Sequence, residues 1–123
     1  MKRTHILVVD DDAGLLSLLK MRLKSTGYAV ETADTGWDGL TKLEQADYDV
    51  VLLDYMMPGI TGLTVLQHIH ARHPSVPVVM MTSHINSQVA AQALAGGAQA
   101  CLIKPVDPVE LEQTLQYCVG SAA

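Results

Sequence analysis

One segment near the middle of the chain constrains the fold more than any other. Residues 50–54 read Val-Val-Leu-Leu-Asp, so four branched apolar side chains follow one another without polar alternation. Such a run predicts a strand that is covered on both faces, as in a parallel sheet. Pro58 and Gly59 then predict a turn. Asp54 is therefore expected at the carboxyl end of a central strand, the edge where open α/β sheets bind ligands.

The same alternation of an apolar run and an amphipathic segment extends along the whole chain. The pattern predicts strands at residues 5–9, 29–33, 50–54, 76–81 and 100–103, and helices at about 13–25, 36–43, 62–73, 89–94 and 108–119. Strict alternation of strands and helices favours an α/β fold with a doubly wound five-stranded parallel sheet of the flavodoxin-like type. We expect strand order 2-1-3-4-5, with helices on both faces.

Length and composition agree with one small domain. The 123 residues suffice for a single domain, 1–123, with a core from about residue 5 to residue 119. No apolar run approaches the ~20 residues of a membrane span and no secretory signal opens the chain, so we expect a cytoplasmic protein. Cys101 and Cys118 lie in apolar patterns and are expected to be free, buried thiols. The net charge of -5 argues against direct nucleic-acid binding by this domain.

Polar side chains stand where four of the predicted strands end. They are Asp10 and Asp11 after the first strand, Asp54 after the third, Thr82 after the fourth and Lys104 after the fifth. Because parallel strands end at one edge of a sheet, we expect these groups to converge. Three carboxylates and one ammonium leave an excess of negative charge, which like-charge repulsion disfavours unless a cation enters, and oxygen ligands favour Mg²⁺. A metal held in this way is typical of phosphoryl chemistry, in which a carboxylate can attack phosphorus.

A second cluster of titratable residues receives a different interpretation. His68, His70 and His73 lie close together on the predicted third helix, but no acidic partner accompanies them in the sequence. A solvated histidine face is favoured over a metal site, because such sites need a complete set of ligands.

The sequence resembles the receiver domains of bacterial two-component response regulators from Ile6 to Val119. The matching segments are Val8–Asp12, Leu53–Gly59, Gly62, Thr82–Ser83, Gly97–Ala98 and Lys104–Pro105. The resemblance implies that Asp54 is the phosphoacceptor, phosphorylated by a histidine kinase or a histidine phosphotransfer protein. It also implies that Thr82 contacts the phosphoryl group and that Lys104 bridges to it before a cis Pro105.

The resemblance also implies a metal site and a set of partners. Asp11 would bind Mg²⁺ directly, Asp10 through water, Asp54 through its carboxylate and Met56 through its backbone carbonyl. An effector domain beyond Ala123 or a separate target protein would receive the signal. A homodimer could form through the face of the fourth helix, fifth strand and fifth helix. No membrane partner and no turnover of an external substrate are expected.

Several positions depart from the family pattern. Cys101 stands where the family usually has the switch aromatic that moves together with Thr82, and Val106 stands where it usually has Phe after Lys-Pro. Gly39 takes the place of Ala in the usual Gly-x-x-Ala of the second helix. An alternative is therefore a protein-binding receiver that works without phosphorylation, in which coupling is weak because of Cys101. Met56 and His84 flank the path of the hydrolytic water in this family. We expect Met56 to dominate and to prolong the lifetime of the phosphoryl group.

Two other classes of protein share part of this pattern. A flavin-binding module of the flavodoxin type shares the strand order, but it needs a phosphate loop where this chain has three acids. A Mg²⁺-dependent phosphohydrolase with an aspartate nucleophile normally carries a second acid two residues later, where this chain has Met56. Both are disfavoured.

Overall fold

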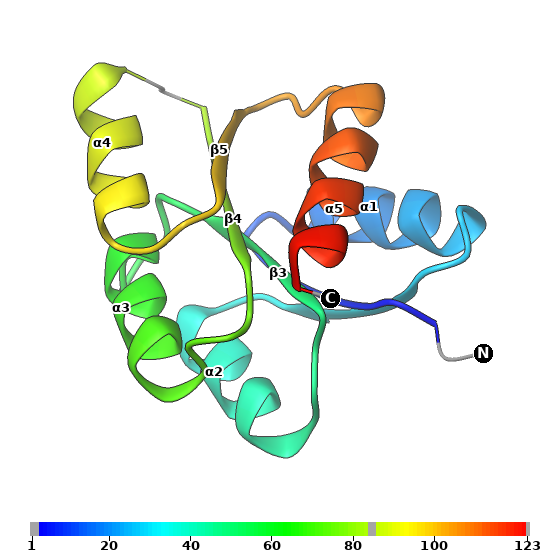
Figure 1. Cartoon of the computed structure of the whole chain (residues 1–123), viewed down its shortest axis with the longest axis horizontal. Helices are drawn as coiled ribbons and strands as arrows, with labels where there is room; N and C mark the ends of the chain where they lie inside the picture. Colours follow the sequence, from blue (N-terminus) through cyan, green and yellow to red (C-terminus); the bar gives the residue numbers. More distant parts are fainter. Residues whose placement is uncertain (1–2, 84–85, 123) are drawn as a thin grey trace.

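The computed structural model describes residues 3–83 and 86–122, and these form five strands and five helices in strict alternation (Figure 1). The strands are β1 His5–Val9, β2 Ala29–Ala33, β3 Val50–Asp54, β4 Val78–Thr82 and β5 Ala100–Ile103. The helices are α1 Ala13–Ser25, α2 Gly36–Gln45, α3 Gly62–Arg72, α4 Ser87–Ala95 and α5 Pro108–Ala122.

All strand pairs are parallel, and the order across the sheet is β2-β1-β3-β4-β5. This arrangement confirms the predicted doubly wound fold. β3 lies in the centre of the sheet and all five of its residues are buried. The continuous apolar run at residues 50–53 thus reflects burial on both faces.

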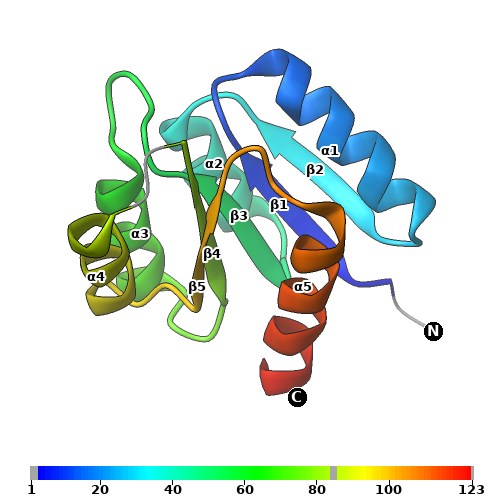
Figure 2. The same ribbon diagram turned by 90° about the horizontal axis from the view of Figure 1, so that it is seen from above.

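The helices cover the two faces of the sheet unequally. α1 and α5 lie on one face, and α2, α3 and α4 lie on the other (Figure 2). Alternate residues of each central strand supply the two cores, so Val51 and Leu53 face α2 and α3, whereas Val50 and Leu52 face α1 and α5. Burial of these large aliphatic side chains from both faces supplies the main driving force for folding.

Each helix begins with a polar side chain that accepts a backbone N–H of its first turn. The capping residues are Asp12, Thr35, Thr61, Asn86 and Asp107. Such caps satisfy donors that have no partner inside the helix. Each capping residue lies in the loop that follows a strand. The helices therefore start at the same edge of the sheet as the predicted site.

Some predicted boundaries were wrong, and burial within two helices is uneven. β4 begins at Val78 rather than Val76, because Val76 is still in the turn that its N–H closes onto His73, and Pro77 follows it. In α3 the fully buried residue of the first turns is Val65, while Leu63 is only partly buried. In α4, Leu94 is 53% exposed. A nine-residue helix of small side chains leaves room for only one buried position, Ala93.

The two cysteines differ in their surroundings. Both thiols are free, and Cys118 is buried as predicted, on the side of α5 that faces the core. Cys101 is only half-buried, because β5 is the edge strand and one of its sides has no neighbouring strand. Burial raises the pKa of both thiols above the ordinary value, so both resist ionisation. None of the helices in the described part of the chain is long and apolar enough to span a bilayer.

Candidate functional site

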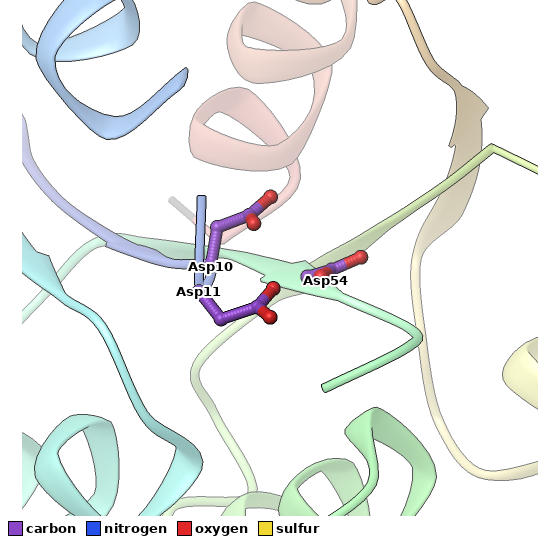
Figure 3. Close-up of side chains that lie close together, drawn as sticks. All are labelled: Asp10, Asp11 and Asp54. Atoms are coloured by element: carbon purple, nitrogen blue, oxygen red, sulfur yellow. The ribbon is translucent and has the colours of Figure 1, made fainter. Parts of the chain in front are cut away.

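The register of the sheet brings the predicted polar residues to one edge. Val9 of β1 lies beside Leu53 of β3, so Asp10 and Asp54 end neighbouring strands. Asp54 in turn lies beside Met81, the residue before Thr82. Figure 3 shows Asp10, Asp11 and Asp54 close together at the ends of β1 and β3.

Asp10 is a fully buried carboxylate with two partners. One oxygen, Oδ1, accepts the backbone N–H of Asp12 at 3.0 Å, and the other, Oδ2, accepts the Lys104 ammonium at 2.6 Å. A buried charge needs such compensation, since an unpaired carboxylate in the interior is strongly disfavoured. The pairing therefore holds the Lys104 ammonium beside the carboxylates.

Asp54 is 4% exposed and shares the same lysine. Its Oδ1 lies 3.1 Å from the Lys104 ammonium, and the backbone N–H of Met56 donates to the same oxygen at 3.4 Å. Burial, followed by repulsion from the Asp10 carboxylate, raises the pKa of Asp54 to about 6, although Lys104 and the Met56 N–H act in the opposite direction. The carboxylate is thus crowded by negative charge, and a further cation would favour its ionised form.

Lys104 reaches the acids from the end of β5. Its backbone N–H donates to the Thr82 carbonyl at 2.8 Å, and the Lys104–Pro105 peptide bond is cis, as the resemblance implied. Burial by itself would lower the pKa of Lys104, but the hydrogen bonds and charges of Asp10 and Asp54 outweigh it and raise that pKa. The side chain therefore remains an ammonium at neutral pH.

The three carboxylates are placed to share one ion. Asp10, Asp11 and Asp54 each offer an oxygen, and these oxygens all lie within 4.8 Å of one another. Asp11 is exposed, so it approaches the group from the solvent side. Oxygen ligands alone fit a hard cation such as Mg²⁺ better than a transition metal.

The remaining predicted site residues flank this cluster. Thr82 is the last residue of β4 and is buried, with its side chain 1% exposed. Met56 lies in the loop after β3 and is 66% exposed. Cys101 lies on β5 and packs at the margin of the core on the α3 side. His84 lies outside the described residues.

Sequence reasoning missed why the loop after Asp54 requires a glycine at position 62. A Cβ atom there would lie 2.3 Å from the carbonyl oxygen of Asp54, which no relaxed structure tolerates. Gly62 instead lets the start of α3 pack against the residues next to Asp54, and its N–H donates to the Tyr55 carbonyl at 3.0 Å. A glycine at the first position of a predicted helix was the signal available in the sequence.

The histidine cluster was predicted to lack acidic partners, and that prediction was wrong. Glu44 at the end of α2 accepts a hydrogen bond from Arg72 at 3.0 Å and lies 3.5 Å from Nε2 of His73. Glu44 is 24 residues or more away along the chain, so helical spacing could not reveal it. His68 packs its ring near Trp37, and His70 is exposed. Among the described residues, the acidic cluster alone has three side chains that could share a metal ion.

The parallel sheet, with buried acids and a lysine at its carboxyl edge, has the architecture expected of a phosphoryl-accepting signalling domain. Comparison with known proteins agrees. Residues 6–116 match the model of the response regulator receiver domain. The chain belongs to this family, and it is a receiver domain of two-component response regulators.

Individual relatives support the assignment. The chain is 38% identical over 122 residues to the transcriptional regulatory protein GlrR of Escherichia coli (strain K12), which covers 99% of this chain and 28% of that protein. It is 36% identical over 108 residues to the transcriptional regulatory protein ResD of Bacillus subtilis (strain 168), covering 88% and 45%. The chain thus spans less than half the length of these two curated relatives.

Solved structures agree with the fold. A CheY-like response regulator receiver domain protein from Methanospirillum hungatei JF-1 superimposes with a TM-score of 0.94 at 30% identity, and the match covers 98% of this chain and 97% of that one. The chemotaxis protein CheY4 of Vibrio cholerae superimposes with a TM-score of 0.90 at 30% identity, covering 95% and 99%.

Proposed function

We propose that Asp54 is the phosphoacceptor and that its phosphorylation by a histidine kinase or a histidine phosphotransfer protein switches the domain. The observation that carries the proposal is the position of Asp54 at the end of the central strand, within 3.1 Å of Lys104 and beside two further carboxylates. In the reaction, an Asp54 carboxylate oxygen attacks phosphorus. The P–N bond of the donor breaks, and its electron pair leaves with the imidazole.

The chain's own residues supply the charge balance for this step. The Lys104 ammonium already binds the attacking carboxylate, so it can follow the developing charge onto the phosphoryl oxygens. Thr82 at the end of β4 carries a hydroxyl suited to donate to one of those oxygens. These groups would promote the reaction by aligning the reactants and by stabilising the charge that develops on the phosphoryl oxygens.

The donor set fits Mg²⁺. Asp10, Asp11 and Asp54 would hold the ion, with the Met56 backbone carbonyl as a further ligand. Bound there, Mg²⁺ neutralises the carboxylates and the incoming phosphoryl oxygens, so that an anion can approach. Asp10 also keeps Lys104 in place, which makes it both a metal-site residue and a positioning residue.

The same assignment defines what the domain does and does not do. It accepts a phosphoryl group and assists its own dephosphorylation, but it turns over no external substrate. It operates in the cytoplasm as one unit, residues 1–123, and passes the signal to an effector domain or a separate target, or forms a homodimer through α4, β5 and α5. The family match supports phosphorylation, and no observation favours the alternative of a receiver that works without it.

Mass spectrometry after incubation with acetyl phosphate tests the proposal. The parent should gain the mass of one phosphoryl group in the presence of Mg²⁺ and should remain unlabelled with excess chelator. Asp54→Asn should gain no mass, whereas the control Asp47→Asn, at an exposed position before β3, should be labelled like the parent. Labelling of Asp54→Asn, or labelling that survives chelation, would contradict the assignment.

A further inference from the structure

The residue that follows Asp54 is fixed to its surroundings through its backbone. The N–H of Tyr55 donates to the carbonyl of Met81 at 2.8 Å, and its own carbonyl accepts the N–H of Gly62 at 3.0 Å. Tyr55 is thereby attached to the end of β4 and to the start of α3. The next N–H, that of Met56, donates to Asp54 Oδ1. The Met56 N–H belongs to the peptide bond between Tyr55 and Met56, so a change at the Asp54 carboxylate reaches the backbone of Tyr55 directly.

The side chain of Tyr55 reaches a third element. Its hydroxyl donates to Oε1 of Gln92 in α4 at 3.0 Å, across 37 residues of sequence. The ring is half-buried and packs against the core between the sheet and α2, α3 and α4. Tyr55 thus connects the loop that carries the phosphoacceptor to a helix that is remote in the sequence.

α4 buries little apolar surface of its own. Among the described residues of this helix, Ala93 is the only buried side chain, and an alanine removes little apolar surface from water. The cap Asn86 accepts an N–H of its own helix and so does not attach it to the sheet. The hydrogen bond from Tyr55 therefore adds a side-chain link between the loop after Asp54 and a helix that otherwise packs against β5 and α3.

We propose that Tyr55 is a positioning residue that couples the state of Asp54 to α4 through its hydrogen bond to Gln92. This inference deepens the proposed function and rests on it. A phosphoryl group on Asp54 adds charge and acceptor oxygens, which redistribute the contacts that Lys104 and the Met56 N–H make with the carboxylate. The adjoining peptide adjusts, and the rigid ring of Tyr55 carries the adjustment to Gln92.

Four variants separate coupling from simple structural support. Tyr55→Phe and Gln92→Leu each remove the hydrogen bond, whereas Gln92→Glu keeps an acceptor oxygen at the same reach. The matched control is Tyr28→Phe, because Tyr28 also donates its hydroxyl across the fold, to Glu112, but packs against the core on the opposite face of the sheet. Gln92 is exposed, so its replacement does not endanger folding.

The measurement is amide hydrogen exchange over residues 87–95, with and without beryllofluoride and Mg²⁺ as a phosphoryl mimic. Without the mimic, exchange should be about two- to fivefold faster in Tyr55→Phe and Gln92→Leu than in the parent, as expected for one partly exposed hydrogen bond. The mimic should change exchange in the parent, in Gln92→Glu and in Tyr28→Phe. In Tyr55→Phe and Gln92→Leu that change should fall by at least half.

Three outcomes overturn the inference. If the mimic changes α4 equally in the parent and in Gln92→Leu, the hydrogen bond does not couple the two sites, even if basal exchange is faster. If Gln92→Glu loses the response as fully as Gln92→Leu, the acceptor is not what matters. If the parent gains no phosphoryl mass from acetyl phosphate, the proposed function fails and the inference fails with it; in the first two cases phosphorylation of Asp54 is intact and only the coupling is wrong.

Discussion

At the scale of single residues, the two neighbours of Asp54 along the chain have opposite surroundings. Tyr55 is held by hydrogen bonds on three sides, whereas the side chain of Met56 is 66% exposed. An exposed thioether beside Asp54 offers no strong hydrogen bond to water, because sulfur is a weak acceptor. We therefore expect the Met56 side chain to shield the carboxylate from one side without positioning a water molecule for hydrolysis.

We expect Met56→Asn to shorten the lifetime of phosphorylated Asp54. An amide at this position can orient the attacking water, and general positioning of this kind contributes about tenfold or more to the rate. The rate of phosphate release after removal of excess acetyl phosphate measures the effect. Met21→Asn is the control, since Met21 is equally exposed, at 65%, but lies on α1. A rate in Met56→Asn equal to or below that of the parent would refute the shielding role.

The sequence predicted which polar residues lie together at the sheet edge, but not which of their side chains contact one another. Asp10, Asp54, Thr82 and Lys104 each end an apolar run or follow one, so strand order alone placed them at one edge. The Lys104 ammonium lies closer to Asp10 than to Asp54. This difference depends on side-chain geometry, which the pattern of apolar and polar residues does not encode. The Tyr55–Gln92 contact was missed for the same reason.

At the scale of elements, the strands were predicted well because each is an uninterrupted apolar run. Errors occurred where a local signal was ambiguous. The segment 76–77 is apolar, yet it belongs to the turn before β4, and α4 has a weak apolar stripe that did not reveal which of its residues is buried. Contacts between elements that are distant in the sequence, such as Glu44 with α3, have no sequence signal of this kind.

One such contact ties α5 to the start of β2. The Tyr28 hydroxyl donates to Glu112 at 2.6 Å, and Gln116 donates to the same carboxylate oxygen. Burial, followed by the hydrogen bond and the charge of Glu112, raises the pKa of Tyr28 to about 12. Because ionisation is harder in the folded state, this contribution to stability is complete below pH 10 and is lost as the pH rises from 10 through 12.

We expect Tyr28→Phe to lower the free energy of unfolding by roughly 1 kcal/mol at pH 7, the usual net value of one hydrogen bond. The difference from the parent should shrink between pH 10 and pH 12, since the parent loses the same contribution there. Urea unfolding across this range measures both values. Tyr117→Phe is the control, because Tyr117 is 65% exposed on α5. A difference that stays constant to pH 12 would show that folding does not raise the pKa of Tyr28.

At the scale of the whole molecule, the site is built at a cost to stability. β1 and β3 are buried on both faces by the two cores, and the same strands end in acids that repel each other. Apolar burial therefore holds the carboxylates together, while Lys104 offsets part of their repulsion. A cation that binds the folded arrangement and not the unfolded chain should stabilise the entire domain.

We expect Mg²⁺ to raise the free energy of unfolding of the parent by about 1.4 kcal/mol at ten times its dissociation constant. Unfolding should be a single cooperative transition, with the urea midpoint shifted and the slope unchanged, since binding alters stability rather than compactness. Asp11→Asn removes the exposed carboxylate of the cluster and should need a much higher Mg²⁺ concentration for the same shift. Asp47→Asn should respond like the parent, and NaCl of equal ionic strength corrects for screening. If Mg²⁺ shifts the midpoint of Asp11→Asn as much as that of the parent, the ion is not held by the carboxylates at the ends of β1 and β3.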